Sequence, residues 1–212
     1  MKRLLLISLA LLLLLSSCAG KPHTFVKNAD GTGYVDEKTD IVYLLLNEPY
    51  EPMASGETVG VYENEKSGVT REFRAIPELD SKLFVADSNL NVYFAGENMT
   101  PAAEWTPTVL LVCREEAISV ERKRFTAGTD DAAIAAILGL WFGDSTATLP
   151  LKEAQVSYRL KLAGAEYPNL LYSFSFLYYG EGEAYFYDPI GRHTVPLPAE
   201  VIALLYTAGQ GG

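Results

Sequence analysis

The side chains of this 212-residue sequence that are best suited to nucleophilic or acid–base chemistry are two cysteines and two histidines: Cys18, Cys113, His23 and His193. A nucleophile needs a base within hydrogen-bond reach, and a structural zinc ion needs four ligands. Cys113 ends the apolar run 109–112, where a lone cysteine is usually a small core residue. Neither histidine has a second ligand at zinc spacing. We therefore expect no catalytic residue, metal site or cofactor, and an enzymatic activity stays open but unsupported.

Two short motifs resemble parts of known sites. GDS at 143–145 is similar to the nucleophile block of GDSL-type esterases, which in that family follows the first strand and is paired with an Asp-x-x-His motif. Here four residues separate Asp188 from His193, so Gly143 is better explained as the end of a helix. Residues 28–39 have the rhythm of an EF-hand loop, but the twelfth position is Thr39 and not glutamate. We expect an ordinary turn there.

The position of Cys18 indicates a different use for its thiol. Lys2 and Arg3 precede an apolar run over 4–15, which is too short to span a membrane and has the length of a signal-peptide core. LSSC at 15–18 matches the lipobox of bacterial lipoprotein signal peptides at every position. The resemblance implies that residues 1–17 are removed and that acyl chains on Cys18 anchor the protein to the cell membrane, on its extracellular or periplasmic side. The alternatives are an ordinary secretory signal and an uncleaved anchor.

Charge restricts the classes of partner. The chain carries 17 basic and 27 acidic residues, a net charge of −10, and removal of 1–17 leaves 195 residues with a net charge of −12. Nucleic-acid binding normally requires a basic patch, and anionic lipids repel an acidic surface. We expect no nucleic-acid partner, a membrane contact made by the lipid on Cys18, and a protein or polymer partner that the sequence does not identify.

Short β-type segments dominate the first half. After a lipidated tether over 18–33, turn residues separate five expected strands, with Gly68 in one hairpin turn: 41–46, 59–63, 70–76, 82–86 and 91–94. Two prolines lie in 97–107. We predict one globular domain over 34–212, or two subdomains that meet near 97–107.

The second half begins with strands at 109–113 and 118–125 and has its best helix signal at 129–142. Asp130 and Asp131 suit the helix N-terminus, and the apolar residues leave no polar stripe, so we expect this helix to be buried on most sides. Strands follow at 155–162, 170–179 and 183–187, then the turn DPIG at 188–191 and a short helix at 199–208. The predicted fold class is α+β, mainly antiparallel meanders and hairpins with one buried helix and a short C-terminal helix.

In a strand over 170–179, alternate residues point to opposite faces, which divides these residues into two sets. One set is Leu170, Tyr172, Phe174, Phe176 and Tyr178, and the other is Leu171, Ser173, Ser175, Leu177 and Tyr179. The first face could be a stacking platform for sugars or a peptide, but five large residues suit a core better. We therefore expect Phe174 and Phe176 to be buried and any ligand contact to fall to Tyr178 or Tyr179. The serine face suits close packing by a helix, or faces water.

The segment YFYDPIGRHTVPL at 185–197 resembles the PepSY-type modules of exported bacterial proteins. The positions that match are Tyr187, Asp188, Gly191, Arg192 and Val195. This resemblance implies a non-enzymatic interaction or inhibitory module. The sequence therefore predicts a lipid-anchored extracytoplasmic protein that binds a partner. The alternatives are a hydrolase acting on envelope or extracellular polymers and a structural subunit of an envelope complex.

Overall fold

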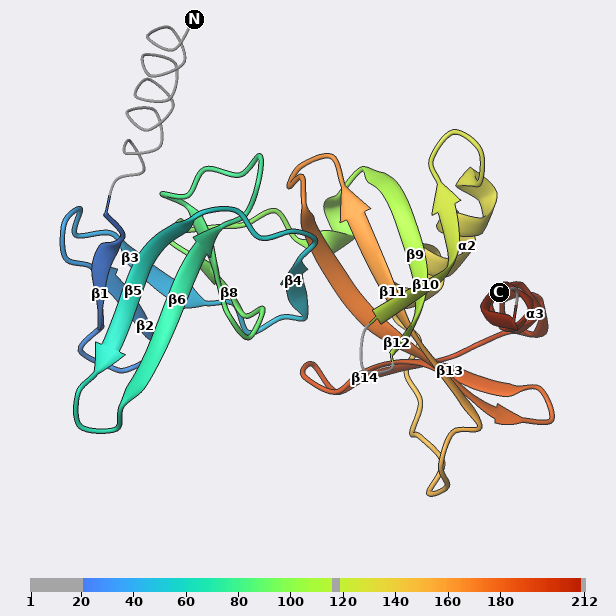
Figure 1. Cartoon of the computed structure of the whole chain (residues 1–212). Helices are drawn as coiled ribbons and strands as arrows, with labels where there is room; N and C mark the ends of the chain where they lie inside the picture. The colour runs from blue at the N-terminus through green and yellow to red at the C-terminus, as the bar shows by residue number, and fades with distance from the viewer. Residues whose placement is uncertain (1–20, 116–118, 211–212) are drawn as a thin grey trace, which may run out of the picture.

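The computed structural model describes residues 21–115 and 119–210, and its first part is a closed β-barrel (Figure 1). Around the barrel the strand order is β1-β2-β3-β8-β7-β6-β5, and a single parallel pair, β1 with β5, closes it. All other barrel pairs are antiparallel. The strands are β1 (His23–Lys27), β2 (Gly33–Asp36), β3 (Val42–Leu45), β5 (Thr58–Asn64), β6 (Val69–Ala75), β7 (Phe84–Asp87) and β8 (Val92–Phe94).

Aromatic side chains fill the barrel interior. The ring of Phe25 stacks on those of Phe73 and Tyr43, with centroids 4.7 and 5.4 Å apart. Gly60 lies against Phe25 so closely that a Cβ there would be 2.2 Å from the ring, so only glycine fits this position. Because Phe25 is a core residue, His23–Lys27 is a barrel strand, and the expected tether over 18–33 is wrong from residue 23 onward. The hairpins β5–β6 and β7–β8 are confirmed, but the closed barrel was not predicted.

The second part is an antiparallel sheet of order β10-β9-β11-β12-β13-β14, in which β4 also pairs with the start of β12. The 3₁₀ helix η2 (Ala102–Glu104) lies between β8 and β9. The strands are β4 (Tyr50–Pro52), β9 (Pro107–Glu115), β10 (Ser119–Thr126), β11 (Val156–Gly164), β12 (Leu170–Gly180), β13 (Glu183–Asp188) and β14 (His193–Pro196). The predicted strands of the second half are therefore confirmed, whereas the insertion of β11 between β9 and β12 was not predicted.

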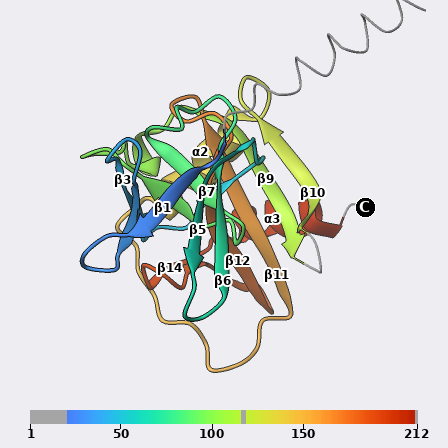
Figure 2. The same ribbon diagram turned by 60° about the vertical axis from the view of Figure 1, so that its left-hand side comes forward.

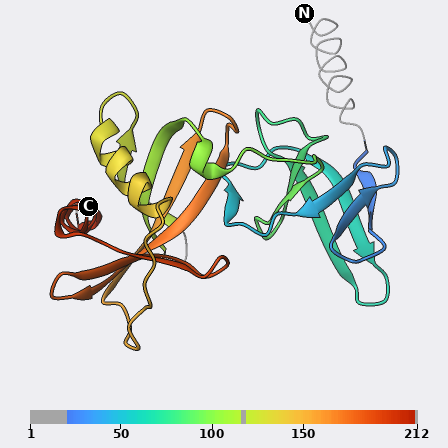
Figure 3. The same cartoon turned by 180° about the vertical axis from the view of Figure 1, so that it is seen from behind.

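Two helices, α2 (Asp131–Trp141) and α3 (Ala199–Gln210), cover the aromatic face of this sheet on the side away from the barrel (Figures 1 and 3). Trp141 stacks on Phe174 with ring centroids 4.5 Å apart. Phe174 and Phe176 have no exposed surface, which confirms the expected core. The interpretation of this strand face as a stacking platform is therefore wrong.

The expected burial of helix 129–142 on most sides is also wrong. Only one face of α2 is buried, through Ile134, Ile137 and Trp141. The opposite face is exposed and consists of small residues: Ala132, Ala135, Ala136 and Gly139. Alanine and glycine carry so little apolar surface that exposing them costs little, so the absence of a polar stripe did not require burial.

The serine face of β12 lies on the barrel side of the sheet. Figure 2, turned toward the barrel, shows β1, β5 and β6 in front of the sheet strands. The main core continues through the junction, because barrel residues such as Phe84 and Val92 belong to the same cluster as Trp105 and Leu170. The chain passes from β8 of the barrel to β9 of the sheet through 95–106, which overlaps 97–107, where the sequence suggested a boundary.

Candidate functional site

A groove between the barrel and the sheet gathers exposed aliphatic side chains from three distant segments. It encloses about 420 Å³. Leu45 at the end of β3, Leu90 between β7 and β8, and Ile190 between β13 and β14 line it and are 39, 50 and 56% exposed. Arg159 of β11 and Ser173 of β12 also line it, on the sheet side. We call this site the junction groove.

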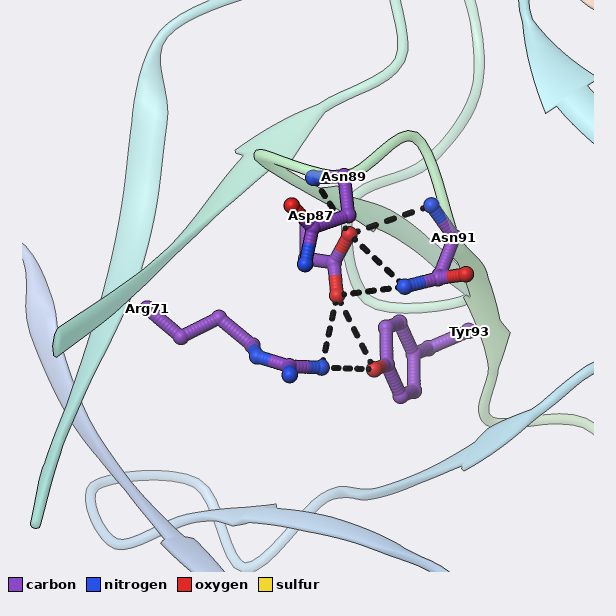
Figure 4. Close-up of polar contacts among 5 residues, drawn as sticks. All are labelled: Arg71, Asp87, Asn89, Asn91 and Tyr93. Carbon is purple, nitrogen blue, oxygen red and sulfur yellow. Dashed lines mark hydrogen bonds and ion pairs between the residues drawn. The ribbon is translucent and has the colours of Figure 1, made fainter. Parts of the chain in front are cut away.

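The turn between β7 and β8 is held by the buried carboxylate of Asp87 (Figure 4). Asp87 accepts hydrogen bonds from the backbone N–H groups of Asn89 and Asn91 at 2.8 and 3.1 Å. It also accepts from Nη1 of Arg71 at 2.7 Å and from the hydroxyl of Tyr93 at 3.1 Å. Burial, reinforced by this carboxylate, raises the pKa of Tyr93 to about 12, so its hydroxyl remains a donor at neutral pH. The network fixes the turn against the barrel.

Both turns that line the groove are built in this way. Asp188 is buried and accepts hydrogen bonds from the N–H groups of Ile190 and Gly191 at 2.8 and 2.9 Å. Leu90 has in addition a φ of 64°, in the left-handed region that costs a side chain such as leucine about 1–2 kcal/mol. Strain of this kind persists only where the surroundings impose it. Two anchored turns therefore present aliphatic side chains to the groove, and one of these residues is strained.

A partly buried ion pair lies at the sheet side of the groove, which its acidic member, Glu51, lines. Nζ of Lys161 lies 2.8 Å from Oε1 of Glu51, and the Ser173 hydroxyl donates to the same oxygen at 2.9 Å. Burial alone lowers the pKa of the Lys161 ammonium, but the Glu51 carboxylate outweighs it, so the pKa is raised and the charge is kept. Glu51 belongs to β4, which lies between the barrel strands β3 and β5 in the chain, and Lys161 belongs to β11. The pair therefore connects this segment to the middle of the sheet.

A second pocket, of about 670 Å³, opens at the barrel end beside the N-terminal segment. Nδ1 of His23 lies 2.7 Å from Oδ2 of Asp36, and the Thr39 hydroxyl donates to the same oxygen at 2.7 Å. Burial acts to raise the pKa of Asp36, but these hydrogen bonds outweigh it and hold the pKa below its usual range. The other ring nitrogen of His23, Nε2, lies 3.2 Å from Nζ of Lys38. Lys38 therefore occupies the place that the nucleophile would have in a hydrolytic triad.

The remaining candidates for covalent chemistry have structural contacts. Nε2 of His193 lies 3.0 Å from the carbonyl oxygen of Trp141, an acceptor, so this nitrogen carries a proton. Cys113 is buried, and burial raises the pKa of its thiol. In residues 21–115 and 119–210, no three His, Cys, Asp or Glu side chains are grouped so that they could hold a metal ion. Neither His193 nor Cys113 lines either of the two pockets described above.

The two tyrosines predicted to contact a ligand lie on opposite faces of β12 and are not brought together. The ring of Tyr178 packs on Tyr206 of α3, with centroids 4.9 Å apart. Tyr179 is buried against Tyr185, under the ammonium of Lys152. Ligand contact at either tyrosine stays a prediction. Cys18 lies outside the described residues.

Sequence reasoning missed the residues that line the junction groove. A signal existed in the turns DSNL at 87–90 and DPIG at 188–191, because each places a large aliphatic residue where polar residues are usual. Arg159 had no such signal, because a polar residue in a strand that alternates between apolar and polar residues is expected to face solvent.

The EF-hand-like stretch at 28–39 contains the β1–β2 turn, in which Asp30 accepts a hydrogen bond from the N–H of Thr32 at 2.9 Å.

None of the helices in the part of the chain that the structure describes is long and apolar enough to cross a membrane. No protein-family model matches the chain, and neither a curated protein nor a solved structure matches it.

Proposed function

We propose that this protein is a lipid-anchored, extracytoplasmic binding module that holds its ligand in the junction groove. The observation that carries the proposal is the convergence of Leu45, Leu90 and Ile190 on one groove. Single exposed aliphatic residues are common on protein surfaces, but a group gathered around one hollow is typical of an interaction site. The strained backbone of Leu90 supports the same conclusion, because asparagine or glycine would relieve the strain at this position.

The anchoring part of the proposal rests on the complete lipobox at 15–18. Cys18→Ala removes the thiol that would receive the diacylglycerol, so we expect an unprocessed precursor that carries no acyl label. Metabolic labelling with an acyl-chain analogue measures this. Label retained by the variant would contradict the anchoring, whereas an unlabelled wild-type protein would contradict the lipoprotein assignment itself.

The groove can be tested with a photo-crosslinking amino acid placed at position 90 of the full-length, membrane-bound protein. Position 69 is the matched control, because Val69 is 48% exposed and begins β6, outside the groove. We expect a discrete adduct from position 90 that position 69 does not form and that Ile190→Asp abolishes. Equal adducts from both positions, or an adduct unchanged by Ile190→Asp, would contradict ligand binding in the groove.

The alternative function, a hydrolase acting on envelope or extracellular polymers, is favoured by one observation. Asp36 orients His23 at the edge of the pocket at the barrel end, as an acid orients a catalytic base. If the protein is a hydrolase, release of soluble fragments from purified envelope polymer should be lost in His23→Ala and kept in His193→Ala. No release by the wild-type protein would exclude this alternative for the polymers tested.

A further inference from the structure

Arg159 is the basic side chain of the junction groove that lacks an acidic partner. It is half-buried in the middle of β11, and its Nη1 donates to the hydroxyl of Ser175 at 3.3 Å. Among the residues that the structure describes, no carboxylate lies within ion-pair distance of its guanidinium. A guanidinium has five N–H donors, so most of its hydrogen-bonding capacity is left for the groove.

The basic side chains near Arg159 are already engaged. Lys161, two residues along the same strand, is paired with Glu51, and Arg71 is paired with Asp87. Glu48 also lines the groove and is exposed, and it lies beside Tyr50, whose pKa is raised by burial and then by this carboxylate. The chain has 27 acidic and 17 basic residues, yet within 21–115 and 119–210 no carboxylate is paired with Arg159. Partial burial makes a charge without a counter-ion unfavourable, and a ligand carboxylate would remove that cost.

The lining of the groove indicates which kind of ligand carries this carboxylate. It combines aliphatic residues, such as Leu90 and Ile190, with polar residues, such as Asn47 and Ser173. An extended peptide offers both kinds of group, because its side chains alternate along a backbone of hydrogen-bonding groups. A lipid chain would instead require a continuous apolar channel.

We infer that the ligand of the junction groove is an extended peptide segment whose acidic side chain binds Arg159 while its aliphatic neighbours contact Leu90 and Ile190. The inference rests on the proposed function, since it names the ligand class of the same groove. Arg159 acts as the specificity determinant, and the aliphatic side chains supply contact area. Arginine suits this role because its planar fork binds a carboxylate through two hydrogen bonds.

The test uses the full-length protein in detergent and a display library of random octapeptides, prepared with free and with amidated C-termini. We expect enrichment of peptides in which Asp or Glu is flanked by Leu, Ile or Val, in both preparations. The best peptide and its Glu→Gln form are then titrated against wild type, Arg159→Leu and Arg159→Lys. Arg74→Leu is the matched control, because Arg74 pairs with exposed Glu72 on the barrel and its loss changes the net charge equally.

For wild type and Arg74→Leu we expect the acidic peptide to bind about 10- to 100-fold more tightly than its amide form, the range for a charge-assisted hydrogen bond. Arg159→Leu should bind both forms equally, and Arg159→Lys should recover part of the preference. If wild type does not distinguish the two peptides, or Arg159→Leu still does, the inference is wrong while the groove proposal stands. Enrichment only with free C-termini would overturn the side-chain assignment. No enrichment over a Leu90→Asp variant would overturn both proposals.

Discussion

The carboxylate of Asp87 is the polar group on which the turn at the junction groove most depends, and Asp87→Asn tests this with almost no change of shape. A carboxylate only accepts hydrogen bonds, whereas a carboxamide has one accepting oxygen and one donating nitrogen. If the oxygen keeps the backbone N–H groups of Asn89 and Asn91, the new NH₂ group faces Nη1 of Arg71 and loses that ion pair. If the amide is flipped, the backbone donors lose their acceptor instead.

The magnitude follows from the burial of this pair. Breaking a buried ion pair costs about 3–5 kcal/mol, and the side chain of Asp87 is fully buried while that of Arg71 is 27% exposed. Because Arg71 keeps some solvent, we expect a loss of about 3 kcal/mol in the free energy of unfolding. The control is Glu72→Gln, which removes an ion pair that is exposed on both sides, and it should cost less than about 1 kcal/mol.

Urea unfolding of the full-length protein, followed by far-ultraviolet circular dichroism, measures both variants. A double-mutant cycle with Arg71→Met isolates the coupling between the two side chains, which we expect to be about 1–3 kcal/mol. Crosslinking from position 90 should also become weaker, because the turn is no longer fixed. If Asp87→Asn and Glu72→Gln cost the same, or if the coupling is near zero, the reasoning about the buried network is wrong.

Two further predictions concern the core. Trp141→Ala should lower the free energy of unfolding by about 3–5 kcal/mol because it empties a site stacked on the sheet, whereas Ala136→Lys on the opposite face of α2 should change it by less than about 0.5 kcal/mol. Urea midpoints decide both, and a large loss for Ala136→Lys would show that this face is covered. Burial raises the pKa of Tyr43 and of Tyr172 from 10.0 to about 12, so the folded state holds these protons more tightly than the unfolded state. The stability that they contribute is complete below pH 10 and is lost as the pH rises to about 12. Since the chain has 13 tyrosines, only the last part of the tyrosinate absorbance should appear together with unfolding, and full ionisation before unfolding would refute the burial of these two hydroxyls.

Local chemistry determined most of the individual elements. The alternation in 170–179 determined which face of β12 is core, because strand geometry sends successive side chains to opposite sides. DPIG predicted a turn that Asp188 does hold, and Gly68 with a φ of 67° lies in the β5–β6 turn. These features depend on residues that are close together in the chain, so the amino-acid sequence by itself is enough to predict them.

Long-range pairing was decided only by the tertiary structure. The closure of β1 on β5 depends on the approach of Phe25 to Gly60, and no local pattern encodes a contact across 35 positions. One side of α2 is exposed although burial on most sides was expected, because a surface of alanine and glycine is compatible with water as well as with a core. The junction groove has the same origin. Leu90 and Ile190 are unusual only as aliphatic residues in polar turns, and Leu45 and Arg159 are ordinary residues in their own segments. They form a site only because the chain leaves the barrel after β3, so that β4 pairs with β12 and brings the two parts together.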